Sequence, residues 1–230
     1  MLVLYRGIAL EPQTEDGDRA AICQTGYLAA KSFWKNTMAK PSAVRSRSSE
    51  LAQAPGEVRD QIQCLPQTPL SYACGDFEGA ARYALSGSGT PVVITFEIAL
   101  EKIIIDGKDF LYTVFQLWDR SGTRHRERVR ENLSTLFGHA ILGWFDRACR
   151  ETDTIARIGL CDLAVHDLAA IGWHYTNRTD IAGRNDRVFR SSFAVPASLD
   201  PAAVLDIQNV AAPPTNPART IHFHTDMLTP

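Results

Sequence analysis

Residues 68–98, TPLSYACGDFEGAARYALSGSGTPVVITFEI, predict a strand, a sharp turn, a short helix, a glycine-serine turn and a second strand. Asp76 precedes the helix, where its carboxylate can accept bonds from the backbone N–H groups of the first turn. Apolar residues then recur at the spacing of a helix face that packs on a core, namely Phe77, Ala80, Ala81, Ala84 and Leu85. After the glycines, apolar residues occupy alternate positions from Val92 to Ile98, which is typical of a half-buried strand.

Two tyrosines belong to this unit, one at the end of the first strand and one on the helix. Tyr72 and Tyr83 have ten residues between them. Tyr83 lies off the apolar stripe, one turn beyond Gly79, which has no side chain to fill the space beside the ring. Because a phenol offers a stacking face and a hydroxyl group, we expect the two rings to form a slot for a flat aromatic ligand. The alternative is that both tyrosines pack at the edge of the core.

Composition favours one soluble globular domain over residues 1–230. Apolar residues make up 45% of the chain and charged residues 22%, as in an ordinary globular protein. The net charge of −2 provides no overall positive potential, so the composition does not indicate general nucleic-acid binding. No run approaches 18 apolar residues, so we expect no membrane span.

The five cysteines are odd in number and lack C-x-x-C spacing, which favours reduced thiols in the cytoplasm over a disulfide scaffold or a zinc ribbon. The opening MLVLYRGIALEP has no basic region and carries a charge at Arg6, so we expect no cleavable signal peptide. A protein delivered into a target cell by a specialised machine without such a signal would have the same features. His222 and His224 would share one strand face, but no third ligand is evident, so we predict no metal site.

Residues 2–9, LVLYRGIA, predict a first strand with Leu2, Leu4 and Arg6 on one face. A buried guanidinium must pair, so we expect Arg6 to meet either an acidic residue or an anionic ligand. Gly7, on the other face, leaves the backbone open to close approach.

The second half of the chain predicts helices followed by strands. Asp106-Gly107 reads as a hairpin turn before a strand, FLYTVF. Apolar residues from Leu133 to Ala148 keep helical spacing, and a second helix is expected from about Thr154 to Ala170. The arginine-rich run before Leu133 is typical of a solvated helix face, with a phosphate or partner site as the alternative. GWHY and RVFRSSFAV are expected to be strands.

The segments LYRG and SYACGDFEGAARYA, followed by a strand, resemble the NAD-binding core of the ADP-ribosyltransferase superfamily. The tyrosine spacing is similar to that of the diphtheria-toxin-like branch, which also includes the poly(ADP-ribose) polymerases. That branch carries Tyr-His-Gly in its first strand, whereas this chain has Tyr5-Arg6-Gly7. An arginine there resembles the branch typified by Arg, Ser-Thr-Ser and Glu, although Ser71-Tyr72-Ala73 departs from Ser-Thr-Ser.

The resemblance implies a role for each matching residue. The Gly7 backbone would bond the nicotinamide carboxamide, and Tyr72 and Tyr83 would sandwich the ring. Arg6 would hold a ribose hydroxyl or a diphosphate oxygen, and Ser71 belongs to the same NAD-binding set. The late acidic residue of the family, usually glutamate, corresponds to Asn185 or Asp186, with Glu97 as an outside candidate.

The implied activity is that of an NAD-dependent mono-ADP-ribosyltransferase, with NAD as substrate and no metal. Nicotinamide would leave through an oxocarbenium-like transition state, and ADP-ribose would pass to a protein or nucleic-acid acceptor. A toxin or effector of this kind leaves room for an immunity or antitoxin protein as partner.

Three other hypotheses stay open. The first is an NAD-degrading toxin of the Arg-Glu-Ser type, acting as a glycohydrolase or phosphorylase. GWHYTNRTDIAGRNDRVF resembles the late motif of these toxins, with Asn177 in place of serine. The second is a catalytically degenerate module that binds a nucleotide or a partner. The third is an unrelated α+β domain. The fold that the resemblance implies is α+β, a split sandwich of two antiparallel sheets around an NAD cleft, with a helical insertion at about 124–170.

Overall fold

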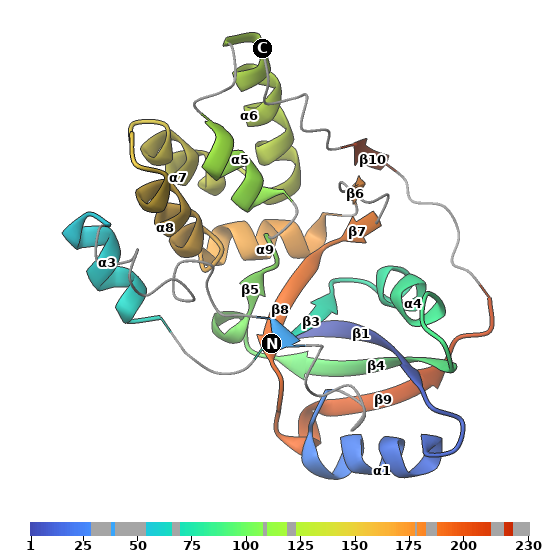
Figure 1. The fold of residues 1–230 in the computed structure, drawn as a ribbon. Helices are drawn as coiled ribbons and strands as arrows, with labels where there is room; N and C mark the ends of the chain where they lie inside the picture. Colours follow the sequence, from blue (N-terminus) through green and yellow to red (C-terminus); the bar gives the residue numbers. More distant parts are fainter. Residues whose placement is uncertain are drawn as a thin grey trace. The chain divides into compact units, whose positions relative to one another are not determined.

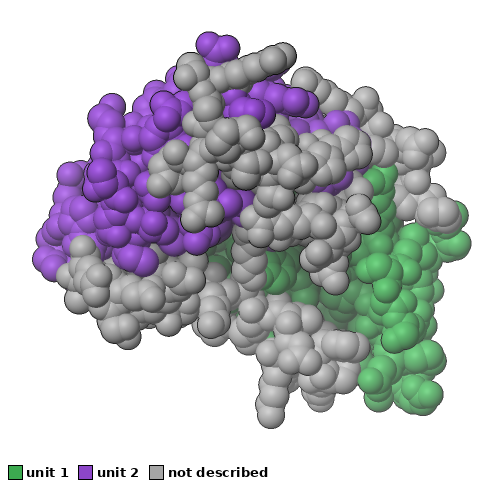
Figure 2. Space-filling view, turned by 45° about the horizontal axis from the view of Figure 1, so that its top comes forward, with its two compact units in different colours: residues 1–39, 68–104, 190–217 green, residues 40–67, 105–189, 218–230 purple. Residues whose placement is uncertain are grey.

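The structure is a computed structural model that describes residues 1–28, 38–39, 54–65, 70–107, 110–118, 123–177, 179–182, 188–212 and 219–222. The chain divides into two compact units, coloured separately in Figure 2. Unit 1 contains residues 1–39, 68–104 and 190–217, and unit 2 contains residues 40–67, 105–189 and 218–230. Helices and strands are mixed in one chain, which confirms the predicted α+β class. The single domain over 1–230 stays a prediction.

Unit 1 is built on a large sheet (Figure 1). Its elements are β1 (Leu2–Leu10), α1 (Glu15–Thr25), β2 (Met38–Ala39), β3 (Leu70–Cys74), α4 (Phe77–Leu85), β4 (Thr90–Ile98), the 3-10 turn Leu100–Lys102, β8 (Ser192–Pro196), the 3-10 turn Pro201–Ala203 and β9 (Val204–Asn209). The chain passes to unit 2 within β5 (Ile104–Ile105). The strand order is β5-β8-β3-β1-β4-β9, and β2 pairs with β3. The pairs β1–β3, β1–β4, β2–β3, β3–β8 and β4–β9 are all antiparallel.

The predicted strand–helix–strand unit is confirmed as β3, α4 and β4. The Asp76 side chain caps α4 by accepting a bond from the Gly79 N–H at 2.6 Å, as the sequence predicts. The apolar side of α4 packs on one face of the sheet, where the buried cluster consists of Cys74, Ala80, Ala81 and Val93. Burial of this stripe, which is typical of an amphipathic helix on a core, holds α4 against β1, β3 and β4.

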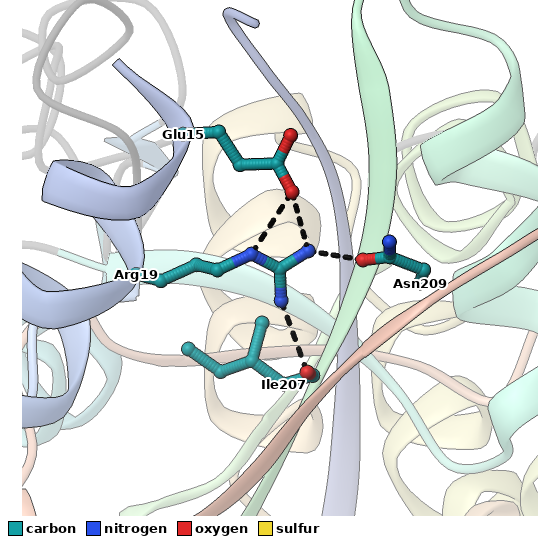
Figure 3. Close-up of polar contacts among 4 residues, drawn as sticks. All are labelled: Glu15, Arg19, Ile207 and Asn209. Carbon is teal, nitrogen blue, oxygen red and sulfur yellow. Dashed lines mark hydrogen bonds and ion pairs between the residues drawn. The ribbon is translucent and has the colours of Figure 1, made fainter.

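An arginine ties α1 to the edge strand of the sheet. Arg19 donates to the Glu15 carboxylate at 2.8 Å and to the Ile207 carbonyl at 3.1 Å (Figure 3). It also donates to the side-chain oxygen of Asn209. Because the Arg19 guanidinium joins a helix near the start of the chain to β9, it fixes the last strand of unit 1 against the first helix.

Unit 2 is mainly helical. Its elements are α3 (Gly56–Gln63), α5 (Leu111–Leu117), α6 (Thr123–Phe137), α7 (Ala140–Ala148), α8 (Thr154–Ala164), α9 (Leu168–Thr176), β6 (Thr179–Ala182) and β10 (Arg219–His222). β7 (Val188–Arg190) carries the chain back to unit 1 and forms a small sheet with the order β10-β6-β7. None of the helices within the described ranges is both long and apolar enough to cross a membrane.

The predicted helical residues are confirmed, but each of the two predicted helices is divided into two. Gly138, with a φ of 77°, separates α6 from α7. A Cβ added there would lie 2.8 Å from Cγ of Trp173, so the position has no space for a side chain. The predicted helix from about Thr154 to Ala170 is two helices, because Asp167 caps a new one by accepting bonds from the N–H groups of Ala169 and Ala170.

Several predicted strands are wrong. FLYTVF lies in and just before α5, and GWHY lies in α9. Asp106-Gly107 makes no hairpin, because the Gly107 carbonyl accepts bonds from the N–H groups of Phe110 and Tyr112 and leads into α5. The β-branched and aromatic residues of FLYTVF are largely buried in a helical unit, where packing outweighs strand propensity.

The prediction of two antiparallel sheets is wrong for the small sheet. β10 pairs with β6 in parallel. Strands so far apart in the sequence are not joined by a hairpin, which is the connection that would force antiparallel pairing. RVFRSSFAV is likewise two strands, β7 and β8, with Ser191 between them.

Candidate functional site

Tyr72 and Tyr83 lie on the same side of the large sheet. Cys74 pairs directly with Tyr5, and both belong to the face that packs on α4. Because side chains alternate along a strand, Tyr72 shares that face with Cys74. Tyr83 is on α4 itself and has 37% of its surface exposed, while Tyr72 is half-buried. The structure therefore places both predicted slot residues over one sheet face, within unit 1.

The ladder between β1 and β3 is short. β1 pairs with β4 along its whole length, from Leu2 to Leu10, whereas its register with β3 consists of Tyr5 opposite Cys74. Continued antiparallel pairing would set Gly7 opposite Tyr72. Instead, a guanidinium from β1 bonds the Tyr72 carbonyl across the two strands.

That guanidinium belongs to Arg6, whose side chain is buried. Arg6 donates from Nη1 to the Tyr72 carbonyl at 2.6 Å and from Nε to the Leu28 carbonyl. Burial lowers the pKa of Arg6 to about 10, so the group stays charged at neutral pH. The sequence predicted an acidic partner or an anionic ligand for Arg6. The structure gives it two backbone carbonyls, which are strong acceptors for a charged donor.

Arg6 faces away from the tyrosine side of the sheet. By strand alternation its side chain lies on the face opposite to Tyr5 and Gly7. Ser71, with 1% of its surface exposed, is on the Arg6 face for the same reason, because it neighbours Tyr72 in β3. The predicted NAD-binding set is thus divided. Gly7, Tyr72 and Tyr83 share one face, and Arg6 and Ser71 share the other.

Gly7 has a packing role of its own. A Cβ placed on Gly7 would lie 1.7 Å from the carbonyl oxygen of Ala80 and 2.9 Å from the amide nitrogen of Ala84. The backbone of α4 therefore occupies the space that a side chain would need. Close approach of a helix to a strand accounts for a glycine at this position without any ligand.

Of the candidates for the late acidic residue, Glu97 alone lies in a described segment. Asn185 and Asp186 lie outside the part of the chain that the structure describes. Glu97 is half-buried on the tyrosine side of β4, where it lies opposite Val3 of β1. Gly7 lies opposite a different residue of β4, Val93. Four residues of strand separate Glu97 from Val93, which is about 13 Å at about 3.3 Å per residue.

A contact between Ser191 and Gly75, beside the tyrosine-bearing helix, has no counterpart among the sequence motifs. Ser191 has a φ of 40° and its carbonyl accepts a bond from the Gly75 N–H at 2.8 Å, immediately before the Asp76 cap. Serine is not a residue that composition rules assign to left-handed backbone, so only the structure reveals this junction.

Metal ligands and disulfides are not features of the described segments. Those segments hold no group of three or more His, Cys, Asp or Glu side chains arranged to bind a metal ion. None of the five cysteines, all of which are in described segments, forms a disulfide.

No protein-family model, no curated protein and no solved structure matches this chain.

Proposed function

We propose that the tyrosine-bearing face of unit 1 binds NAD and that the protein cleaves the nicotinamide–ribose bond, passing ADP-ribose to a macromolecular acceptor. The observation that carries the proposal is the placement of Tyr72 on β3 and Tyr83 on α4 over one face of the sheet. A strand and the helix that directly follows it hold the two phenols in a fixed relation. Offset stacking against one or both rings suits a flat, electron-poor ring such as nicotinamide.

The β1–β3 junction supports the same placement. The ladder ends after Tyr5 and Cys74, and the Gly7 backbone lies two residues farther along β1, at the strand edge that faces β3. Backbone N–H and C=O groups at such a point can bond a carboxamide, which carries one acceptor and two donors. The proposal assigns this bond to Gly7.

Arg6 has a different role in this proposal from the one that the resemblance implies. Because its guanidinium is buried and bonds the Tyr72 carbonyl, Arg6 positions Tyr72 and does not contact NAD. An arginine suits this role, since its planar fork can bridge two carbonyls while remaining charged.

The chemistry requires stabilisation of positive charge as nicotinamide leaves. Two stacked rings and a bonded carboxamide hold the leaving group in one orientation, which lowers the entropy cost of reaction. A fixed carboxylate near the ribose would stabilise the oxocarbenium-like transition state. Asp186 would supply this carboxylate, and Asn185, which is uncharged, is the alternative residue proposed for the same position.

The test is to incubate the purified full chain with NAD and to measure nicotinamide by chromatography and the fate of ADP-ribose by mass spectrometry. We expect nicotinamide release by the wild type and its loss in both Tyr72→Ala and Tyr83→Ala. Leu85→Ala is the matched control, because Leu85 is also on α4 and is 36% exposed. It removes a similar exposed apolar surface without an aromatic ring, and it should keep wild-type activity.

The products separate the proposal from its alternatives. ADP-ribose attached to a protein or nucleic acid supports the transferase. Free or phosphorylated ADP-ribose assigns the same site to an NAD-degrading enzyme. Saturable NAD binding without nicotinamide release assigns it to a catalytically degenerate module, and no binding at all refutes the NAD proposal.

A further inference from the structure

Ser191 adopts a backbone conformation that serine rarely has. Within the described ranges, Ser191 is the one non-glycine residue with a positive φ, which is 40°. The other residues there with a positive φ are glycines, namely Gly26, Gly89 and Gly138. In the left-handed region the Cβ of an L-residue crowds the following carbonyl, so glycine is the favoured residue there. Such strain persists only where the surroundings impose it, and it is concentrated at functional sites.

The Ser191 side chain fills the space over Gly75. A Cβ added to Gly75 would lie 2.7 Å from the Ser191 Cβ and 3.3 Å from its Oγ. The Gly75 N–H also donates to the Ser191 carbonyl at 2.8 Å. Gly75 is therefore held from two directions, by a backbone bond and by a side chain that packs where its own Cβ would stand.

Gly75 lies between the elements that carry the two tyrosines. β3 ends at Cys74 and α4 begins at Phe77, after the Asp76 cap. Any change in the backbone at Gly75 alters how α4 leaves β3. The separation of the Tyr72 and Tyr83 rings depends on this junction.

We infer that Ser191 is a positioning residue for the tyrosine slot, its Cβ wedged against Gly75 to fix the junction of β3 and α4. The inference rests on the proposed function for the identity of the ligand, but the contact itself does not. In this role Ser191 acts through its contacts with Gly75 and is assigned no contact with the substrate. A misplacement of about 1 Å in a binding group can cost on the order of a hundredfold in rate, so a loosened junction has a measurable effect.

The decisive variant is Ser191→Gly in the full chain, compared with Ser191→Ala. The glycine variant removes the wedge and relieves the backbone, whereas the alanine variant keeps the Cβ. We expect Ser191→Gly to remain at least as stable as wild type in urea unfolding while its dissociation constant for NAD rises by about tenfold or more. Ser191→Ala should bind NAD within about threefold of wild type, because the Cβ alone makes the closest contact. Ser198→Gly, at an exposed serine, is the matched control and should leave the affinity unchanged.

Amide hydrogen exchange at Gly75 and in the first turn of α4 decides the inference independently of NAD. We expect exchange there to be about tenfold faster or more in Ser191→Gly than in wild type and Ser191→Ala. Unchanged exchange and affinity in Ser191→Gly would overturn the positioning role. If wild type binds no NAD but the exchange difference is present, the proposed ligand is wrong, whereas the role of Ser191 in fixing the backbone at Gly75 is supported.

Discussion

The substitution Gly7→Ala tests how closely α4 packs on β1. The added Cβ would stand 1.7 Å from the Ala80 carbonyl oxygen, whereas ordinary contact begins at 3.4 Å. The difference, 3.4 − 1.7 = 1.7 Å, is the distance by which the helix and the strand must separate. The obstructing atoms belong to the backbone of α4, so no side-chain rotation can relieve the clash.

The cost of Gly7→Ala follows from this displacement. Overpacking a tight interior costs about 1–3 kcal/mol, and we take the upper end, about 3 kcal/mol, because an entire helix must move. For a chain of this size, about 3 kcal/mol corresponds to a fall in Tm of about 6–12 °C. Thermal melting followed by far-ultraviolet circular dichroism, together with urea unfolding, measures both quantities.

Gly17→Ala is the control for Gly7→Ala. Gly17 is exposed within α1, and a Cβ there would meet nothing within 4 Å. Alanine in a helix interior is favoured over glycine by about 0.5–1 kcal/mol, so this variant should be slightly more stable than wild type. A Gly7→Ala protein within about 1 kcal/mol of wild type would contradict the packing argument.

Arg6, Gly138 and Cys149 are buried or strained groups whose substitution or modification can be measured directly. Arg6→Met removes the guanidinium donor from the buried Leu28 carbonyl and the part-buried Tyr72 carbonyl, and it should lower the free energy of unfolding by about 2–5 kcal/mol, measured in urea. A loss below about 0.5 kcal/mol would show that water replaces the guanidinium. Gly138→Ala forces a side chain into left-handed backbone and should cost at least about 1–2 kcal/mol in the same assay, and a neutral result would contradict the turn geometry. Burial raises the pKa of Cys149 to about 11, so little of its thiol is ionised at pH 8. It should therefore react with iodoacetamide at least roughly tenfold more slowly than the exposed thiols of Cys23 and Cys64, as measured by peptide mass spectrometry. Equal rates would show that the Cys149 thiol is not protected.

The part of the fold that the sequence predicts correctly is the part governed by local patterns. The stripe that begins at Phe77, the Asp76 cap and the alternation after Thr90 each specify one element, and all three elements are present. Leu85, predicted to be on the core side of the helix, is instead 36% exposed at its end. The segment FLYTVF carries a misleading pattern, because β-branched and aromatic residues suit a strand yet are buried here in a helix. Local propensity cannot show which partner element will bury a segment.

For the candidate site, too, the sequence predicts what depends on local pattern and misses what depends on long-range pairing. Alternation along LVLYRGIA correctly sets Arg6 and Gly7 on opposite faces, but the face of Tyr72 depends on the pairing of Cys74 with Tyr5. That pairing joins strands separated by some seventy residues, and no local pattern encodes it. The partners of Arg6 were also beyond prediction, since backbone carbonyls such as that of Leu28 have no signature in a sequence.

The most direct test of the nicotinamide slot is fluorine NMR of the chain labelled with 3-fluorotyrosine, titrated with NAD. The protein has six tyrosines, and Tyr72→Phe and Tyr83→Phe assign two of the resonances. Stacking of the nicotinamide ring predicts saturable ring-current shifts of the Tyr72 and Tyr83 resonances, with the other four little changed. Saturable NAD binding that leaves both of these resonances in place, or the absence of any shift at millimolar NAD, would contradict the proposal.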